Sequence, residues 1–74
     1  MADMTVDARG LQCPMPVIKT AQAIGKIESG QTLEIIASDK GALSDIPAWA
    51  DDMGHQVTEQ FEEPGEYHFI LEKS

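Results

Sequence analysis

The chain contains a single cysteine, Cys13, in 74 residues, and this limits the ways in which so small a protein can be stabilised. A chain of this length buries only about 60–65% of its unfolded surface, so small domains often add disulfides or a structural metal. One cysteine cannot form an internal disulfide, and the two histidines are too scattered to suggest a metal site. We therefore expect no metal or other cofactor, and a fold that rests on the apolar residues, which make up 42% of the chain.

The length and the N-terminal residues indicate one cytoplasmic domain spanning residues 1–74. The first four residues lack the basic and apolar segments of a secretory signal, and no apolar run approaches the roughly 20 residues of a membrane span. A lone cysteine in such a chain is expected to remain a thiol. We expect a monomer that makes no contact with a membrane.

The formal charge of −8 is concentrated in the second half of the chain. Residues 41–74 contain eight acidic residues and one lysine, whereas residues 1–40 contain five acidic and four basic residues. Direct binding to nucleic acid is not expected, because phosphate contacts need clustered lysine and arginine. The acidic half favours either simple solubility or the steering of basic protein partners toward the near-neutral half that contains Cys13.

The pattern of apolar residues predicts the order strand, helix, strand, helix, strand, strand. Residues 4–8 alternate between apolar and polar side chains, as a strand with one buried face does. A helix is expected from Pro14 or Pro16 to about residue 27, with a buried stripe formed by Val17, Ile18, Ala21, Ile24 and Ile27. Residues 32–38 alternate in the same way, and Ile36 adds a second apolar face, so this strand is expected at the centre of the sheet.

The second helix is expected over residues 45–53. Asp45 is a good N-cap, and Pro47 is tolerated in a first turn because its missing N–H has no partner there. Gly54 is a natural C-cap. The inward side chains are expected to be Ile46, Trp49, Ala50 and Met53.

The C-terminal part predicts a hairpin of strands 55–62 and 67–73 joined by a type II turn. Glu59 shares a strand face with Val57 and Phe61, so we expect an edge position or a bulge there. A right-handed crossover makes the first two strands parallel. The predicted fold class is α+β, a two-layer sandwich with both helices on one face of a mixed four-stranded sheet.

Cys13 lies where the first predicted strand gives way to the first predicted helix. A helix N-terminus favours an anion and can lower the pKa of a thiol below its free value of about 8.5, and a thiolate is the form that attacks sulfur. Pro14 and Pro16 have no N–H, which leaves Met15 and Val17 as donors. We therefore expect the two proline rings mainly to hold Cys13 outward on a stiff segment, more than to stabilise its thiolate.

Three charged residues are further candidates for the same site. Arg9 precedes Cys13 by four residues and Lys19 follows it by six, so either side chain can add positive potential at the thiol. Asp45 can contact the loop that contains Cys13, although helix N-cap is its preferred assignment. Most free cysteines are small buried side chains, but Cys13 stands outside any apolar stripe, which favours an exposed and reactive thiol.

Two segments of the chain carry a family resemblance. Residues 7–17, DARGLQCPMPV, contain a Cys-Pro-x-Pro core, and residues 45–49, DIPAW, are followed by Gly54 and His55. Together these segments resemble the TusA family of sulfur carriers, also called the SirA-like family. The similarity extends over nearly the whole chain, and the fold of that family is the two-layer sandwich predicted above.

The resemblance implies that Cys13 accepts a sulfane sulfur as a persulfide and relays it to an acceptor protein. The implied donor is a cysteine desulfurase or a rhodanese-type protein, and the routes include tRNA thiolation, molybdenum cofactor maturation and other sulfur trafficking. Such a protein is a sulfurtransferase that works with partners rather than a stand-alone enzyme. Some family members have a second cysteine where this chain has Ala50, so a relay here uses one cysteine.

Two other functions stay open from the sequence. One is a regulatory module in which Cys13 senses oxidants and forms a sulfenic acid or a mixed disulfide. The other is a binding module that uses the acidic hairpin residues and does not need Cys13. Its acidic residues are Glu59, Glu62, Glu63 and Glu66.

Overall fold

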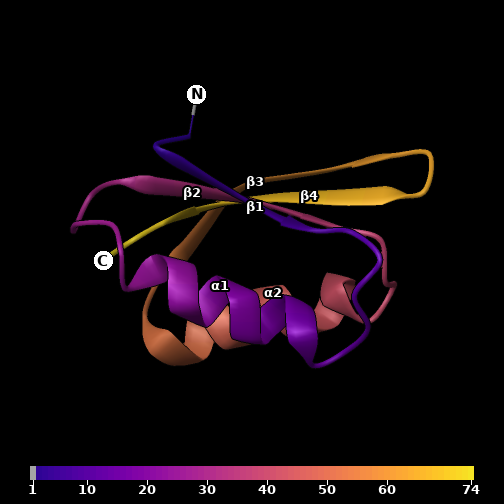
Figure 1. The fold of residues 1–74 in the computed structure, drawn as a ribbon. Helices are drawn as coiled ribbons and strands as arrows, with labels where there is room; N and C mark the ends of the chain where they lie inside the picture. Colours follow the sequence, from indigo (N-terminus) through magenta and orange to yellow (C-terminus); the bar gives the residue numbers. More distant parts are fainter. Residues whose placement is uncertain (1) are drawn as a thin grey trace.

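The computed structural model describes residues 2–74, in which two helices cover one face of a four-stranded sheet (Figure 1). The elements follow the predicted order, and the predicted two-layer α+β sandwich is confirmed. Their bounds are β1 Met4–Ala8, α1 Met15–Ile24, β2 Thr32–Ala37, α2 Ala42–Met53, β3 Gln56–Glu63 and β4 Glu66–Glu72. Within residues 2–74, no helix has the length and apolar character needed to cross a membrane.

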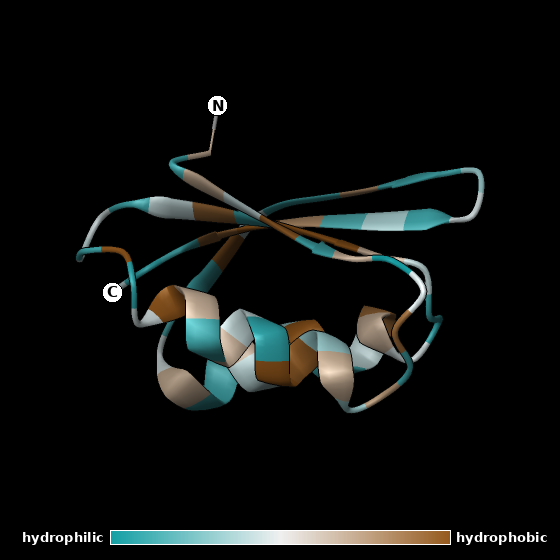
Figure 2. Cartoon of the chain, in the orientation of Figure 1, coloured by the Kyte–Doolittle hydropathy of each residue, from teal (hydrophilic) through white to brown (hydrophobic). Residues whose placement is uncertain are grey.

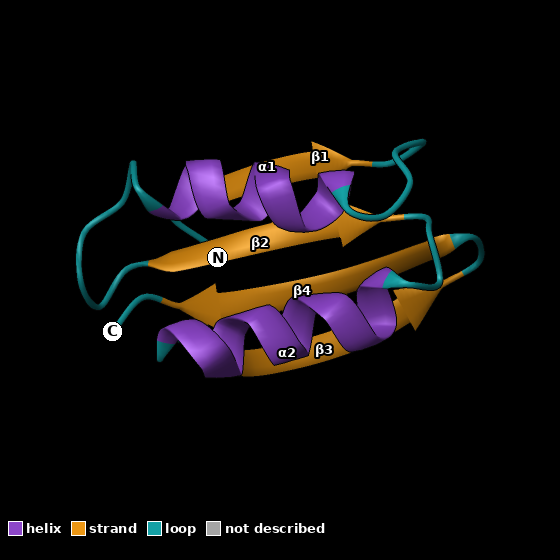
Figure 3. Cartoon of the chain, turned by 90° about the horizontal axis from the view of Figure 1, so that it is seen from below, coloured by secondary structure: helices purple, strands orange, loops and turns teal. Residues whose placement is uncertain are grey.

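The strand order in the sheet is β1-β2-β4-β3. Strand β1 pairs with β2 in parallel, as the crossover predicts, and β4 pairs with both β2 and β3 in antiparallel orientation. Helix α1 packs on β1 and β2, and α2 packs on β3 and β4, so the helices lie side by side on one face of the sheet (Figure 3). Because β1 and β2 are parallel, the loops that lead from them into the helices leave the sheet at the same end.

The core lies between the helices and the covered face of the sheet. Apolar and polar residues are mixed along each helix and most strands, as in elements that bury one face and expose the other (Figure 2). Burial of one large apolar side chain contributes about 1.5–3 kcal/mol, so a few such residues supply much of the stability of a thin core. The largest fully buried apolar side chains are Phe69, Leu33, Ile35, Ile46 and Leu71.

The buried stripe of α1 is rotated from the predicted one. Ile18 is 40% exposed and Ala21 is also exposed, whereas Pro16 and Thr20 are buried. Burial of Thr20 is possible because its hydroxyl donates a hydrogen bond to the Pro16 carbonyl oxygen at 2.7 Å. The helix also ends three residues before the predicted end, but Ile27 remains buried beyond it.

Helix α2 begins three residues before the predicted start. The backbone N–H of Ala42 donates to the Asp39 carbonyl and that of Asp45 to the Gly41 carbonyl, so the preceding turn continues directly into the helix. Two predictions are therefore wrong: Asp45 is inside the first turn rather than the N-cap, and Pro47 lies inside the helix. Burial of Met53 is also wrong, since 56% of this residue is exposed at the end of the helix.

The predicted irregularity in the hairpin is confirmed, because β3 is an edge strand and also has a register shift between Val57 and Glu59. Val57 pairs with Leu71 of the buried face, whereas Glu59 and Phe61 lie on the face that the helices leave uncovered. The predicted shared face for Val57 and Phe61 is therefore wrong. Phe61 instead stacks on His68, with ring centroids 4.6 Å apart.

Candidate functional site

The loops that follow β1 and β2 are hydrogen bonded to each other at one end of the sheet. The Gly10 N–H donates to the Ser38 hydroxyl oxygen at 2.8 Å, and the Cys13 N–H donates to Asp39 Oδ2 at 3.0 Å. Gly10 has φ +80°, a backbone conformation that glycine adopts without steric cost. Cys13 is thus fixed by contacts from a second loop as well as by its own chain.

The Cys13 side chain is exposed and points toward the first turn of α2. Its thiol donates a hydrogen bond to Asp45 Oδ2, with 2.8 Å between sulfur and oxygen. Because α2 begins at Ala42, Asp45 lies about one turn after the cap residue Gly41, and from there its carboxylate reaches the thiol. For Asp45, the sequence favoured the role of helix N-cap over a contact with the Cys13 loop. The structure shows the contact.

The electrostatic environment of Cys13 favours the protonated thiol. The pKa of Cys13 is raised above its ordinary value, first by the hydrogen bond to Asp45, then by desolvation and by the negative charges of Asp45 and Asp39. The Met15 N–H, expected as a donor to a thiolate, donates instead to the Gln12 carbonyl at 2.8 Å. The lowered pKa that a helix N-terminus suggests is therefore not found here.

The two prolines beside Cys13 have different positions. Pro14 is exposed at the N-cap position of α1, and the peptide bond between Cys13 and Pro14 is cis. Pro16 is fully buried as the second residue of the helix. Pro16 therefore anchors the start of α1 in the core, while Pro14 stays at the surface next to the thiol.

Arg9 is paired with carboxylates other than those beside Cys13, and Lys19 lies on the exposed side of α1. Arg9 forms ion pairs with Asp7 at 2.8 Å and Glu66 at 3.1 Å, and its hydrogen bond lowers the pKa of Asp7 to about 2. Lys19 is exposed and lines a shallow groove between α1 and β1. The charges that raise the pKa of Cys13 are those of Asp45 and Asp39, and a contribution of Arg9 or Lys19 to the potential at the thiol stays a prediction.

Two residues of the site, Asp39 and Gly41, were not expected as functional from the sequence. A Cβ at position 41 would lie 3.1 Å from Asp39 Oδ2, 3.6 Å from Asp45 Oδ2 and 3.7 Å from Cys13 Cβ. A side chain at this position would therefore crowd the groups that hold Cys13. The signal for this in the sequence is the acidic turn with a glycine immediately before the second helix.

The surface beside Cys13 is open rather than enclosed. A shallow hollow of about 270 Å³ lies between the two loops, next to the thiol-bearing residue. Its lining residues are Gly10, Leu11, Gln12, Ser38 and Asp39. The arrangement suits contact with the surface of another protein more than enclosure of a small molecule.

Comparisons with known proteins agree on one family. A family model described as Sulfurtransferase TusA matches residues 4–73. The sulfur carrier protein TusA of Allochromatium vinosum is 39% identical over 72 residues, 97% of this chain and 95% of that protein. YrkI of Bacillus subtilis is 44% identical over 72 residues, 97% and 96% of the two chains. The crystal structure of a SirA-like protein from Desulfitobacterium hafniense matches with a TM-score of 0.82 at 25% identity, covering 93% of this chain and 95% of that one.

Proposed function

Because this chain belongs to the TusA family of sulfur carriers, we propose that Cys13 accepts a sulfane sulfur as a persulfide and relays it to an acceptor protein. The observation that supports this most directly is the exposed Cys13 thiol, fixed where two loops meet and hydrogen bonded to Asp45. A sulfur carrier needs a donor and an acceptor protein. The proposed donor is a cysteine desulfurase or a rhodanese-type protein, and the proposed acceptor belongs to tRNA thiolation, molybdenum cofactor maturation or another sulfur route.

In the proposed transfer, a sulfane sulfur moves from one cysteine to another without net oxidation. The Cys13 thiol loses its proton, and the thiolate attacks the outer sulfur of the donor persulfide. The sulfur–sulfur bond of the donor breaks, a new one forms on Cys13, and the donor cysteine leaves as a thiolate that takes up a proton. The acceptor thiolate then attacks the outer sulfur of the Cys13 persulfide in the same way. No oxidant, reductant or cofactor is consumed.

Asp45 is proposed to keep the Cys13 thiol protonated, and so less reactive, when no partner is bound. Its carboxylate accepts the thiol hydrogen bond at 2.8 Å and favours the protonated sulfur. Protonated thiols react slowly with peroxides and alkylating agents, so Cys13 stays reduced between encounters with its partners. This supports the carrier over the redox-sensing module, because sensor cysteines are accessible groups with a low pKa. The proposed relay belongs in the cytoplasm, where thiols are kept reduced.

Pro14 is proposed to present the thiol to partners. The residue is exposed next to Cys13, and its ring restricts the backbone at the point where the loop enters α1. Pro16 is a poorer test of this idea, because its burial gives it a separate role in folding.

The proposed partners approach with basic surfaces. Besides the acidic hairpin, Asp39 and Asp45 lie directly against Cys13, so the thiol is in acidic rather than near-neutral surroundings. Complementary charge mainly raises the rate of association and makes it depend on salt. Association rates that do not change with ionic strength would contradict this part of the proposal.

The relay is tested by following sulfur from donor to acceptor. The protein is incubated with a cysteine desulfurase and cysteine labelled with radioactive sulfur, separated from the donor, and treated with a thiol reductant. The expected result is label on the wild-type chain that the reductant releases, and none on Cys13→Ser. Equal labelling of the two proteins, or none on either, would contradict the proposal.

Labelling, peroxide treatment and partner binding together separate the alternatives. A redox-sensing module would take no label from the donor but would react with peroxide at Cys13. A binding module that uses the acidic hairpin would lose its partner when Glu59 and Glu62 are changed to lysine, and would keep it in Cys13→Ser.

A further inference from the structure

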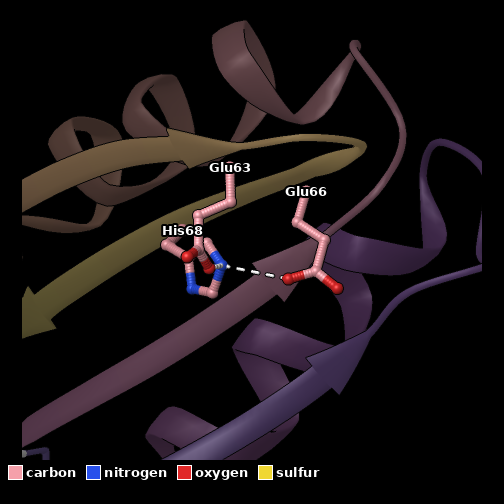
Figure 4. A group of neighbouring side chains, drawn as sticks. All are labelled: Glu63, Glu66 and His68. Carbon is pink, nitrogen blue, oxygen red and sulfur yellow. Dashed lines mark hydrogen bonds and ion pairs between the residues drawn. The ribbon is translucent and has the colours of Figure 1, made fainter.

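The hairpin end of the sheet brings three metal-ligand side chains together on the face that the helices leave uncovered. Glu63 ends β3 and pairs with Glu66, which begins β4, and His68 follows two residues later on the same face. The three side chains converge in the close-up of this region (Figure 4). His68 Nε2 lies 3.0 Å from Glu63 Oε1 and 3.2 Å from Glu66 Oε1. One ligand atom from each residue lies within 4.8 Å of the other two.

The contacts of His68 leave more acceptors than a neutral imidazole can satisfy. Its other nitrogen, Nδ1, lies 3.3 Å from Glu34 Oε2, so the ring faces carboxylates on both sides. A neutral ring has a single N–H. If Nδ1 donates that hydrogen to Glu34, the lone pair of Nε2 faces two carboxylate oxygens with no hydrogen between them. The His68 side chain is only 8% exposed, so water can relieve little of this repulsion.

Two contacts outside the Glu63–Glu66 pair fix the His68 ring. Glu34 comes from β2, and a carboxylate on the far nitrogen of a histidine is the usual outer partner of a metal-bound imidazole. Phe61 stacks on the ring with an angle of 9° between the planes. The ring is therefore held in one orientation with Nε2 directed between the two glutamates.

The distances from His68 Nε2 to the two glutamate oxygens are close to the ligand spacing around a small divalent ion. Bonds from Zn²⁺ to nitrogen or oxygen are about 2.0–2.1 Å long, so tetrahedral ligands lie about 3.3–3.4 Å apart. The observed 3.0 Å and 3.2 Å are slightly shorter, and the Glu63 side chain, which is 59% exposed, is free to move outward. Arg9 occupies only Oε2 of Glu66, so Oε1 remains available.

We propose that Glu63, Glu66 and His68 form a binding site for a divalent transition-metal ion such as Zn²⁺, with water in the remaining position. An imidazole nitrogen and two carboxylate oxygens suit such ions, and Glu34 acts as the outer partner that directs Nε2 toward the metal. The site is separate from Cys13 and does not depend on sulfur transfer. A doubly protonated His68 bound to the same carboxylates is the metal-free alternative, and the test decides between them.

The test is titration of the full-length chain with Zn²⁺ by isothermal calorimetry. Cys13→Ser serves as the starting protein, because a free thiol also binds zinc. We expect one ion per chain, and binding at least about tenfold weaker after Glu63→Gln removes a ligand from the exposed end of the site. Glu62→Gln is the matched control: it removes the same charge from the neighbouring residue, whose side chain lies on the opposite face of β3. Its affinity should change less than about twofold.

Two further measurements assign the ligands. The Nε2 resonance of His68 should shift when Zn²⁺ is added, and the ring of His55 should not. Glu34→Gln should weaken binding by about 10–100-fold through the orientation of His68. The proposal is overturned by the absence of saturable binding up to about 1 mM Zn²⁺ or by equal affinities of the Glu63→Gln and Glu62→Gln proteins.

Discussion

Replacing Asp45 with asparagine should make Cys13 more reactive toward a small alkylating agent. Asparagine has nearly the same shape, so the first turn of α2 is preserved, but the negative charge next to the thiol is lost. Since the Asp45 hydrogen bond is the main cause of the raised Cys13 pKa, this substitution should lower that pKa toward its ordinary value. More thiolate is then present at neutral pH, and the thiolate is the form that is alkylated.

The size of the effect follows from the exposure of the site. An ordinary cysteine with a pKa of about 8.5 is about 3% thiolate at pH 7, and Cys13 begins below this fraction because its pKa is raised. Charge interactions at exposed positions change an equilibrium by a factor of about 1.5 to 5. Cys13 is exposed, so alkylation at pH 7 should become about 1.5 to 5 times faster in Asp45→Asn.

The assay is the pseudo-first-order rate of iodoacetamide modification between pH 6 and pH 11, followed by intact mass. The rates of the wild-type and Asp45→Asn proteins should converge at high pH, where both thiols are ionised. Asp51→Asn is the control, since it removes an equal charge from an exposed position in the last turn of the same helix. A slower or unchanged rate in Asp45→Asn, or an equal increase in Asp51→Asn, would refute the proposal that Asp45 keeps the Cys13 thiol protonated.

Three further predictions test other parts of the structure. Pro14→Ala should slow sulfur transfer while shifting the Cys13 pKa little, and a loss of transfer that disappears at high pH would show the reverse. Arg9→Gln should raise the Asp7 pKa from about 2 toward 3.8, measured by carboxyl NMR. Because the pKa of Asp7 is lower in the folded state, the Arg9–Asp7 pair stabilises the fold above about pH 4, and this contribution is lost as the pH falls through about 2. An unchanged Asp7 titration in Arg9→Gln would contradict the pairing. Phe69→Ala should lower the free energy of unfolding in urea by about 3–5 kcal/mol, and a loss below about 1 kcal/mol would contradict its place in the core.

The fold could be predicted because it depends on patterns that act over short distances along the chain. Alternation identified the strands, and the single apolar residue on the second face of the central strand, Ile36, correctly indicated its interior position. The charge of Glu59 among apolar neighbours indicated an edge position or a bulge, and the structure has both. The stripe of α1 was predicted less well, because burial of Thr20 depends on a hydrogen bond to Pro16 that hydropathy does not describe.

The geometry around Cys13 depends on contacts between segments that are far apart in the chain. Local sequence patterns could not predict these contacts. Aspartate is a common N-cap residue, but the carbonyls of Asp39 and Gly41 accept backbone hydrogen bonds that start α2 before Asp45. The Asp45 carboxylate then accepts the hydrogen bond of the thiol. The thiol therefore lies in an acidic environment, which the sequence around Cys13 did not indicate. The cluster around His68 was missed for a related reason: its ligands are adjacent only after the hairpin turn pairs Glu63 with Glu66.

Intact mass spectrometry tests most directly whether Cys13 carries the transferred sulfur. The wild-type protein, Cys13→Ser and Asp45→Asn are each incubated with a cysteine desulfurase and cysteine and weighed without reduction. We predict a gain of one sulfur atom in the wild-type and Asp45→Asn proteins, no gain in Cys13→Ser, and loss of the added mass after reduction. An unchanged wild-type mass, or the same gain in Cys13→Ser, would contradict this prediction.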